Sequence, residues 1–430
     1  MAFQAVKGTR DFYPEDMAIR NWITEAWRRV SIRNGFVEFD GPVLEYLDLY
    51  RVKSGEEIVS QLFNLTDRAG RQLAMRPEIT PTLARMVNAK INSLPRPIKW
   101  FSVPRLFRAE NPQKGRLREF FQWNIDIIGG EEGISDAECV FTAIDALQEL
   151  GLTAGEAQVR YSSRKLLSEV LKAAGLSAES VPGMLAVLDK RSKVPAEAFA
   201  EMLAGAVTDE AIRPKVLAFL EGSSGTGDLP QELQSLKNEP IEQALAELKT
   251  FQKALDAFGI ADWCKYDVNV VRGLAYYTGI VYEVFDAAQS LRAVAGGGRY
   301  DNLLEVLGGP KVGATGLGMG DAVLGILLEE KGKRPVLTNR LDAFVISGLE
   351  GQDASAVLSL AAKLRRGGII CDYSARSANV GKLLKEANRR QARYAVILSG
   401  PSAGLKDLGT GQQVDVNVAE LVSDPRRFLV

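Results

Sequence analysis

The sequence predicts an α+β protein in which an antiparallel sheet carries a helical insertion and a smaller α/β domain follows. Three observations lead to this prediction. Short β-type segments in the first 130 residues are joined without the helical crossovers that parallel strands require. The pattern from about residue 165 to 262 is helical. The last 90 residues alternate short apolar strands with helices, as βαβ units do.

Composition places the chain among globular proteins and excludes several classes of chemistry. Its 430 residues are 46% apolar and 25% charged, which is enough for two or three domains. No run of eighteen apolar residues and no signal-peptide pattern occurs, so we expect a cytoplasmic protein with no membrane segment. Its cysteines, Cys139, Cys264 and Cys371, are too far apart to suggest a disulfide framework or a paired-cysteine metal site.

The chain contains no histidine at all. This excludes nucleophiles activated by an imidazole, zinc sites with imidazole ligands and a histidine general base. Chemistry must therefore depend on Arg, Lys, Glu, Asp, Tyr, backbone amides or a hard cation bound by carboxylates.

The N-terminal part begins with an amphipathic helix and continues in strands. Apolar residues at helical spacing predict a helix over about 16–33, which Asn34-Gly35 ends. An extended segment over 36–45 follows, and Pro42 confines it to an edge or an interface. Further strands are expected at 61–66, 72–75, 98–103 and 123–128, and a second helix at 137–150.

Beyond the helical insertion, strands return and include two glycine-rich segments. We expect strands at 268–274 and 280–285, a glycine-dense strand at 296–301, and a segment 313–320 that leads into a helix over 322–330. Residues 331–339 are interpreted as a linker. In the final domain, strands are expected at 343–347, 369–373 and 392–398.

The final domain is mildly basic. From Thr338 onward there are 13 Lys and Arg against 9 Asp and Glu, an excess of +4, which would suit a polyanionic partner. The basic residues around one expected helix are Arg376, Lys382, Lys385, Arg389 and Arg390.

The segment from Phe107 to Gln122 is the most informative motif. On an extended strand Arg108 and Glu110 point to the same side. A basic loop broken by Pro112 and Gly115 follows, and the motif closes on Phe120-Phe121-Gln122. It is interpreted as a strand, loop and strand around an anion, although a solvated surface hairpin is an open alternative for this segment alone.

Together these features resemble class II aminoacyl-tRNA synthetases, specifically the histidine-specific family, over essentially the whole length. The opening Lys7-Gly8-Thr9-Arg10-Asp11, the proline at Pro42 and the hairpin of residues 108–122 resemble family motifs. The most specific match is Val271-Arg272-Gly273-Leu274-Ala275-Tyr276-Tyr277-Thr278-Gly279. The resemblance implies a catalytic core over 1–330 with its insertion at about 165–262, a linker at 331–339 and an anticodon-binding domain over 340–430.

The resemblance also implies an activity and roles for individual residues. The family joins L-histidine to tRNA(His) through a histidyl-adenylate, with ATP and Mg²⁺ as the expected cofactors, and forms homodimers. Arg108 and Arg272 would be catalytic and, with Glu110, would bind ATP. The residues implied to bind histidine are Glu78, Thr80, Gln122, Asp126, Tyr276 and Tyr277; those implied to meet the tRNA acceptor end are Asn111, Gln113, Lys114 and Arg116.

Three positions depart from the family pattern. Val323 stands where an arginine is usual, Asn111 replaces an arginine of the bacterial loop, and Ala275 replaces an acidic residue. Val323 favours an alternative, a catalytically silent paralogue resembling the regulatory subunit of ATP phosphoribosyltransferase. A synthetase for another amino acid, such as glycine or threonine, is a third alternative, but it gives no reason for Asp126 beside Tyr276 and Tyr277.

Overall fold

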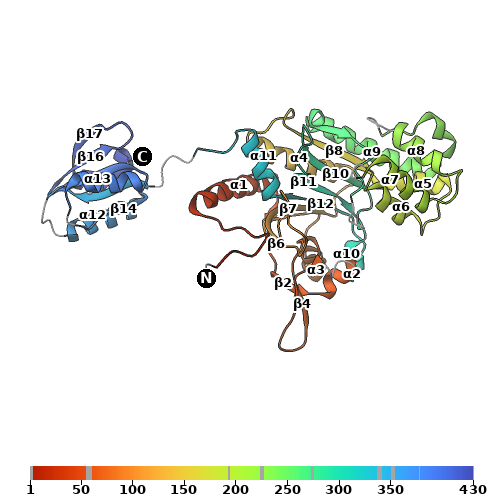
Figure 1. Cartoon of the computed structure of the whole chain (residues 1–430), viewed down its shortest axis with the longest axis horizontal. Helices are drawn as coiled ribbons and strands as arrows, with labels where there is room; N and C mark the ends of the chain where they lie inside the picture. Colours follow the sequence, from red (N-terminus) through yellow and green to blue (C-terminus); the bar gives the residue numbers. More distant parts are fainter. Residues whose placement is uncertain are drawn as a thin grey trace. The chain divides into compact units, whose positions relative to one another are not determined.

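The computed structural model describes residues 3–54, 61–191, 194–222, 227–272, 276–336, 341–349, 354–376 and 378–429. The chain divides into two compact units, Met1–Arg334 and Pro335–Val430, which we describe separately (Figure 1). Within the described residues, no helix combines the length and the apolar character needed to cross a membrane.

Unit 1 is built on a nine-stranded sheet. Its strands are β1 (Val37–Glu38), β5 (Ile98–Ser102), β6 (Arg105–Phe107), β7 (Glu119–Ile128), β8 (Ala157–Ser163), β9 (Cys264–Tyr266), β10 (Ile280–Asp286), β11 (Ala295–Tyr300) and β12 (Ala314–Gly320). Their order is β1-β5-β7-β12-β11-β10-β8-β9, with β6 also paired to β7. The centre is antiparallel as predicted, whereas the pairs at the two edges, β1 with β5 and β8 with β9, are parallel.

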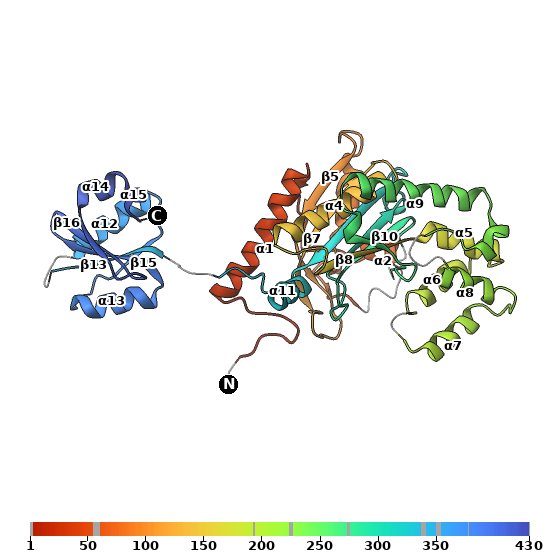
Figure 2. The same ribbon diagram turned by 90° about the horizontal axis from the view of Figure 1, so that it is seen from above.

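Three long helices cover one face of this sheet: α1 (Pro14–Arg33), α4 (Ile134–Glu149) and α9 (Glu239–Ala257) (Figure 2). The helix expected at the N-terminus is confirmed as α1. Its buried stripe includes Trp27, which stacks on Trp123 of β7 with ring centroids 6.1 Å apart. Because side chains alternate along a strand, the residues of β7 that share this face with Trp123 are Ile125 and Ile127. The main apolar core therefore lies on the helix-covered side.

The opposite face carries shorter elements and the polar residues discussed below. These elements are α2 (Asp48–Ser54), α3 (Thr80–Lys90), α10 (Leu303–Val306) and a three-stranded sheet of β2 (Leu44–Tyr46), β4 (Gln72–Met75) and β3 (Asn64–Thr66). Leu83 and Val87 of α3 pack here with Ile128, Val281 and other residues of the large sheet. Asp126 shares this face with Ile128, again because of the two-residue period.

The region expected to be helical contains five α-helices within its described residues: α5 (Arg164–Ala174), α6 (Val181–Leu188), α7 (Ala196–Ala206), α8 (Arg213–Gly222) and α9. Two 3₁₀ turns, η2 (Gln231–Leu236) and η3 (Ala261–Trp263), complete it. Helix α5 starts where the side chain of Ser163 accepts a hydrogen bond from the amide of Leu166, and α9 starts with the same type of cap from Asn238.

One predicted strand is wrong. Residues 268–272, the described part of the strand expected at 268–274, are not in a strand; Gly273 and Leu274 lie outside the described residues. Arg272 has φ 56°, a left-handed conformation that interrupts an extended strand. Val268, Val270 and Val271 gave a strand-like pattern because they are buried, although their backbone does not pair in a sheet.

Unit 2 is a separate α/β domain. It contains β13 (Leu341–Ser347), α12 (Ala354–Arg366), β14 (Cys371–Tyr373), α13 (Val380–Arg389), β15 (Ala392–Ser399), β16 (Ser402–Asp407), β17 (Gln413–Asn417), α14 (Val418–Ser423) and α15 (Pro425–Leu429). Strands β14, β13 and β15 are parallel, which confirms the predicted βαβ pattern, and β16 and β17 add antiparallel strands that the sequence did not predict. Helices α12 and α13 cover opposite faces of this sheet (Figure 2).

Candidate active site

Four glycines form a bare floor on the face of the large sheet opposite α1 and α4. Gly296 of β11 pairs with Gly318 of β12, and Gly298 pairs with Gly316. The four glycines therefore form two cross-strand pairs, two residues apart along each strand. Directly opposite residues point to the same face. The glycine-dense strands therefore leave room above the sheet that any side chain would fill.

Side chains of the predicted site residues occupy that room. A Cβ on Gly296 would overlap the guanidinium of Arg272, and one on Gly316 would overlap the carboxylate of Asp126. A Cβ on Gly318 would come within 2.8 Å of the Gln122 side chain, and one on Gly298 within 3.0 Å of the Tyr277 ring. The structure thus brings four of the predicted site residues together over one floor.

Arg272 reaches the floor from a constrained loop. Its own φ of 56° is rare for a residue with a side chain. The buried guanidinium of Arg164 donates to the carbonyls of Arg272 and Val271, at 2.8 and 3.3 Å, and so holds this conformation. Burial tends to lower the pKa of Arg272, but Tyr277 and Glu283 outweigh it and the pKa is raised. Its Nε lies 3.8 Å from Glu283 Oε1.

Arg108 approaches the same space from the end of β6. Its Nε donates to the carbonyl of Pro77 at 3.2 Å, and its guanidinium lies over the Phe120 ring, 5.0 Å from the centroid. Burial lowers the pKa of Arg108, while the nearby Glu78 opposes that effect. Strand β6 ends at Phe107, so Arg108 and Glu110 are not on an extended strand as the sequence suggested.

The predicted histidine-binding residues form an aromatic and acidic cluster. Tyr276 contacts Tyr277 and Tyr300 with ring centroids 4.6 and 5.7 Å apart, and its hydroxyl donates to Glu78 Oε2 at 3.5 Å. The Tyr300 hydroxyl donates to Asp126 Oδ1 at 2.5 Å. Burial, followed by the neighbouring Tyr277 and Glu78, raises the pKa of Tyr276 well above its usual range, so this phenol stays protonated at neutral pH. Thr80 begins α3, two residues after Glu78.

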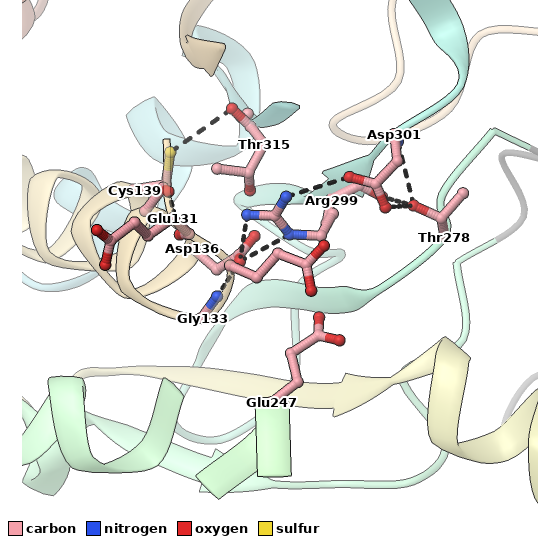
Figure 3. Close-up of polar contacts among 12 residues, drawn as sticks. Glu131, Gly133, Asp136, Cys139, Glu247, Thr278, Arg299, Asp301 and Thr315 are labelled. Carbon is pink, nitrogen blue, oxygen red and sulfur yellow. Dashed lines mark hydrogen bonds and ion pairs between the residues drawn. The ribbon is translucent and has the colours of Figure 1, made fainter. Parts of the chain in front are cut away.

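A buried polar network supports this cluster from the helix-covered side (Figure 3). Arg299, 2% exposed, pairs with Asp136 of α4 at 2.9 Å and with Asp301 at 3.1 Å. Asp301 in turn accepts a hydrogen bond from the Thr278 hydroxyl at 2.5 Å, and the Thr278 amide donates to the Arg299 carbonyl. Because Thr278 follows Tyr277 directly, the network fixes the end of the loop that carries both tyrosines.

The basic loop of the hairpin is organised by its own contacts. Arg116 forms an ion pair with Glu110, and its backbone bridges to Gln113. Lys114 lies 3.6 Å from Glu330 of α11 (Asp321–Glu330), and Asn111 is exposed. Gly115 lies over Val323, whose Cγ2 would be 2.9 Å from an added Cβ. Position 323 is therefore filled by an aliphatic side chain beneath the loop.

A cavity of about 690 Å³ opens between the hairpin and the glycine floor. Its walls include five arginines, Arg108, Arg116, Arg160, Arg272 and Arg292, against three carboxylates, Asp189, Asp267 and Glu283. Of the predicted residues, Arg108, Arg116, Gln122 and Arg272 line it. The remaining described ones do not: Glu78, Thr80, Glu110, Asn111, Gln113, Lys114, Asp126, Tyr276 and Tyr277. The excess of arginines over carboxylates would favour an anion in this cavity.

Sequence reasoning missed three residues of the site. Arg164, Tyr300 and Arg292 carry no motif, and each is recognised only from its contacts. Ala275, one of the departures from the family pattern, lies outside the described residues. Among the described residues, no group of three or more Asp, Glu or Cys could form a metal cage.

Comparison with known proteins identifies relatives along the full chain. A family model described as histidyl-tRNA synthetase matches residues 8–320. Histidine–tRNA ligase of Opitutus terrae is 40% identical, covering 99% of this chain and 98% of its own length. The chloroplastic/mitochondrial histidine–tRNA ligase of Arabidopsis thaliana is 37% identical, covering 96% of this chain and 85% of its own length.

Solved structures share the fold. Histidyl-tRNA synthetase from Nostoc sp. PCC 7120 superposes with a TM-score of 0.81 at 22% identity and covers 99% of both chains. An ATP phosphoribosyltransferase regulatory subunit/histidyl-tRNA synthetase from Bacillus halodurans has a TM-score of 0.76 at 22% identity, covering 93% of this chain and 100% of its own. These likenesses confirm the predicted α+β fold of class II synthetases.

Proposed function

Since this chain belongs to the histidyl-tRNA synthetase family, we propose that it activates L-histidine with ATP and transfers it to tRNA(His). The observation that carries the proposal is the convergence of Arg272, Asp126, Tyr277 and Gln122 on the glycine floor, beside an arginine-lined cavity. Above the floor, the carboxylate of Asp126 and the phenol of Tyr277 could bind an imidazole. The arginines of the cavity could bind a triphosphate.

In the first step, a carboxylate oxygen of histidine attacks the α-phosphorus of ATP. A bond forms between that oxygen and phosphorus, the bond from the α-phosphorus to the bridging oxygen breaks, and pyrophosphate leaves with the electron pair. The reaction needs no covalent group from the protein, so catalysis depends on positioning and on cations that meet the negative charge of the transition state. Arg108 and Arg272 are the two cations that we assign to the α-phosphate and the attacking carboxylate.

The histidine side chain fits the polar cluster chemically. We assign its ring N–H to Asp126 as acceptor, and the ring's other nitrogen to a donor phenol from Tyr276 or Tyr277. Glu78, Thr80 and Gln122 would hold the ammonium group. In the second step, the terminal ribose hydroxyl of the tRNA attacks the acyl carbon of the adenylate. An ester bond forms, the bond from the acyl carbon to the phosphate oxygen breaks, AMP leaves with the electron pair, and the hydroxyl proton is released.

We assign the adenine amino group to Glu110 and propose that Mg²⁺ enters with ATP. Because the described residues offer no ready-made cage, the ion would be held mainly by phosphate oxygens and water, as Mg²⁺ commonly is. We assign no step of the reaction to it.

The tRNA is proposed to contact both units. Asn111, Gln113, Lys114 and Arg116 would meet the acceptor end, and the basic face of α13 in unit 2 would meet the anticodon stem-loop. Lys382, Lys385 and Arg389 are exposed on that helix while Leu383 and Ala387 are buried, so the cations share the outer face.

We also propose a homodimer. The small sheet near Pro42 exposes apolar side chains, including Val43 at 41%, Leu44 at 43% and Tyr46 at 56%. An exposed apolar patch on a sheet edge is typical of a subunit interface. Sedimentation of the full chain at micromolar concentration should give a dimer, and a monomer would contradict this assignment.

The decisive experiment is histidine-dependent ATP–pyrophosphate exchange on the purified chain. Exchange with histidine and none with glycine or threonine would support the proposal. The neutral Val323 is the specific observation that favours a second candidate, a silent paralogue acting as a regulatory subunit. Absence of exchange together with stable binding to an ATP phosphoribosyltransferase would support that candidate instead.

A further inference from the structure

The cavity arginines fall into two groups by their partners. Three have a carboxylate within 4 Å: Arg116 with Glu110, Arg160 with Asp267, and Arg272 with Glu283. In the part of the chain that the structure describes, Arg108 and Arg292 form no such ion pair. Arg108 is already assigned to the reacting centre, which leaves the charge of Arg292 unaccounted for.

Arg292 lies at the outer end of the cavity. It belongs to the connection between β10 and β11, and its Nη1 reaches Gln113 Oε1 on the hairpin loop at 3.4 Å. Its side chain is exposed. This long contact with a neutral acceptor links the guanidinium to the hairpin but does not neutralise it, so the charge stays available to an anion in the cavity.

Arg292 lines the cavity together with residues of the hairpin and of α11. Gly115 and Arg116 from the hairpin, Val323 from α11 and Arg292 line the same cavity as the floor residues. At this end Val323 contributes no charge and Arg116 is paired with Glu110. With the α-phosphate at Arg108 and Arg272, the β- and γ-phosphates would need a further cation of the cavity. Among the described lining residues, Arg292 is the arginine that has neither a carboxylate within 4 Å nor an assigned role.

We propose that Arg292 binds the β- and γ-phosphates of ATP and the departing pyrophosphate. The inference rests on the proposed function, because it places the α-phosphate at the glycine floor. Arg292 is then a substrate-binding residue whose contribution scales with the number of phosphates, and its planar guanidinium is suited to paired contacts with phosphate oxygens.

The test compares ATP with AMP on the full chain by calorimetry. Arg292→Gln should weaken ATP binding by about tenfold to a hundredfold, as expected for a lost charged hydrogen bond, and should leave AMP binding unchanged. The ATP affinity of Arg292→Lys should lie between those of the wild type and Arg292→Gln. Arg68→Gln is the matched control, since Arg68 is also exposed on unit 1 but does not line the cavity, and it should bind both nucleotides as the wild type does.

Exchange kinetics separate this inference from the proposed function. Arg292→Gln should raise the KM for ATP and for pyrophosphate while the KM for histidine stays constant. Unchanged ATP affinity, or equal weakening of ATP and AMP, would overturn the role of Arg292. If the wild type shows no exchange but its ATP affinity still depends on Arg292 and its AMP affinity does not, the proposed function fails and the phosphate site stands.

Discussion

The two units place their charged residues in opposite ways. Unit 1 buries charge next to its sheet: Arg299, Asp136, Arg164 and Asp126 are all less than 9% exposed. Among the described residues of unit 2, Ser374 is the one polar side chain that is buried, and no described lysine or arginine there is buried. Unit 1 encloses charged side chains beside its sheet, whereas unit 2 presents its charged side chains to solvent.

The difference shows which unit depends on fixed geometry. A buried ion pair is costly to desolvate and adds little stability, so Arg299 with Asp136 is better explained by the orientation that it imposes on the Thr278 loop. Exposed cations attract a polyanion by long-range electrostatics that water and salt screen, and this attraction does not require exact positions. Substitutions should therefore have larger and more specific effects in unit 1.

The largest effect is expected for Arg272→Ala. Loss of a cation aimed at the transition state should reduce histidine-dependent exchange on the order of 10³-fold, with kcat affected more than KM. The melting temperature should change little, because the wild-type guanidinium lies in the cavity and not in the apolar core. Arg376→Ala in unit 2 is the control and should exchange normally; equal losses in the two variants would remove the distinction between the units.

Gly296→Ala tests the floor itself. The added methyl group would overlap the Arg272 guanidinium, and we expect exchange to fall on the order of 10²-fold through displacement of that group. Gly325→Ala in α11 is the matched control: its added methyl group would meet no atom within 4 Å beyond its own stretch of helix, and alanine in a helix interior should stabilise unit 1 by about 0.5–1 kcal/mol. Normal exchange by Gly296→Ala would refute the role of the bare floor.

Asp126→Asn tests the histidine pocket. The amide keeps the size of the side chain but removes the negative charge, so the KM for histidine should rise about tenfold, which corresponds to about 1.4 kcal/mol. The KM for ATP should not change. Tyr300→Phe removes only the hydrogen bond to Asp126 and should raise the same KM by a smaller factor. An unchanged KM for histidine in both variants would make this acid structural.

Replacement of Lys382, Lys385 and Arg389 by Gln tests unit 2. Three lost phosphate contacts should raise the KM for tRNA by about tenfold at low salt and flatten the dependence of affinity on salt concentration. Exchange, which needs no tRNA, should stay at the wild-type rate. A fall in exchange would mean that α13 acts on unit 1 and that the two units are not functionally separate.

Much of this architecture could be predicted because its signals are local. The apolar period of α1, the βαβ alternation of unit 2 and the strand β4 follow from spacing within a few residues. The valines of 268–271 misled because burial, not pairing, explains their apolar character. The roles of Arg164, Tyr300 and Arg292 depend on contacts between segments more than 100 residues apart, and no local pattern carries that information.

The glycine floor also limits how this protein can evolve. Glycine has no side chain, so every substitution at Gly296 or Gly316 adds atoms in the space that Arg272 or Asp126 occupies. A mutation at an ordinary core position can be compensated by a smaller neighbour. Here the neighbours are side chains that we assign to catalysis and substrate binding, so shortening them is expected to lower the activity. We therefore expect no substitution of Gly296 or Gly316 to be neutral, and random mutagenesis with selection for growth should recover glycine at both positions.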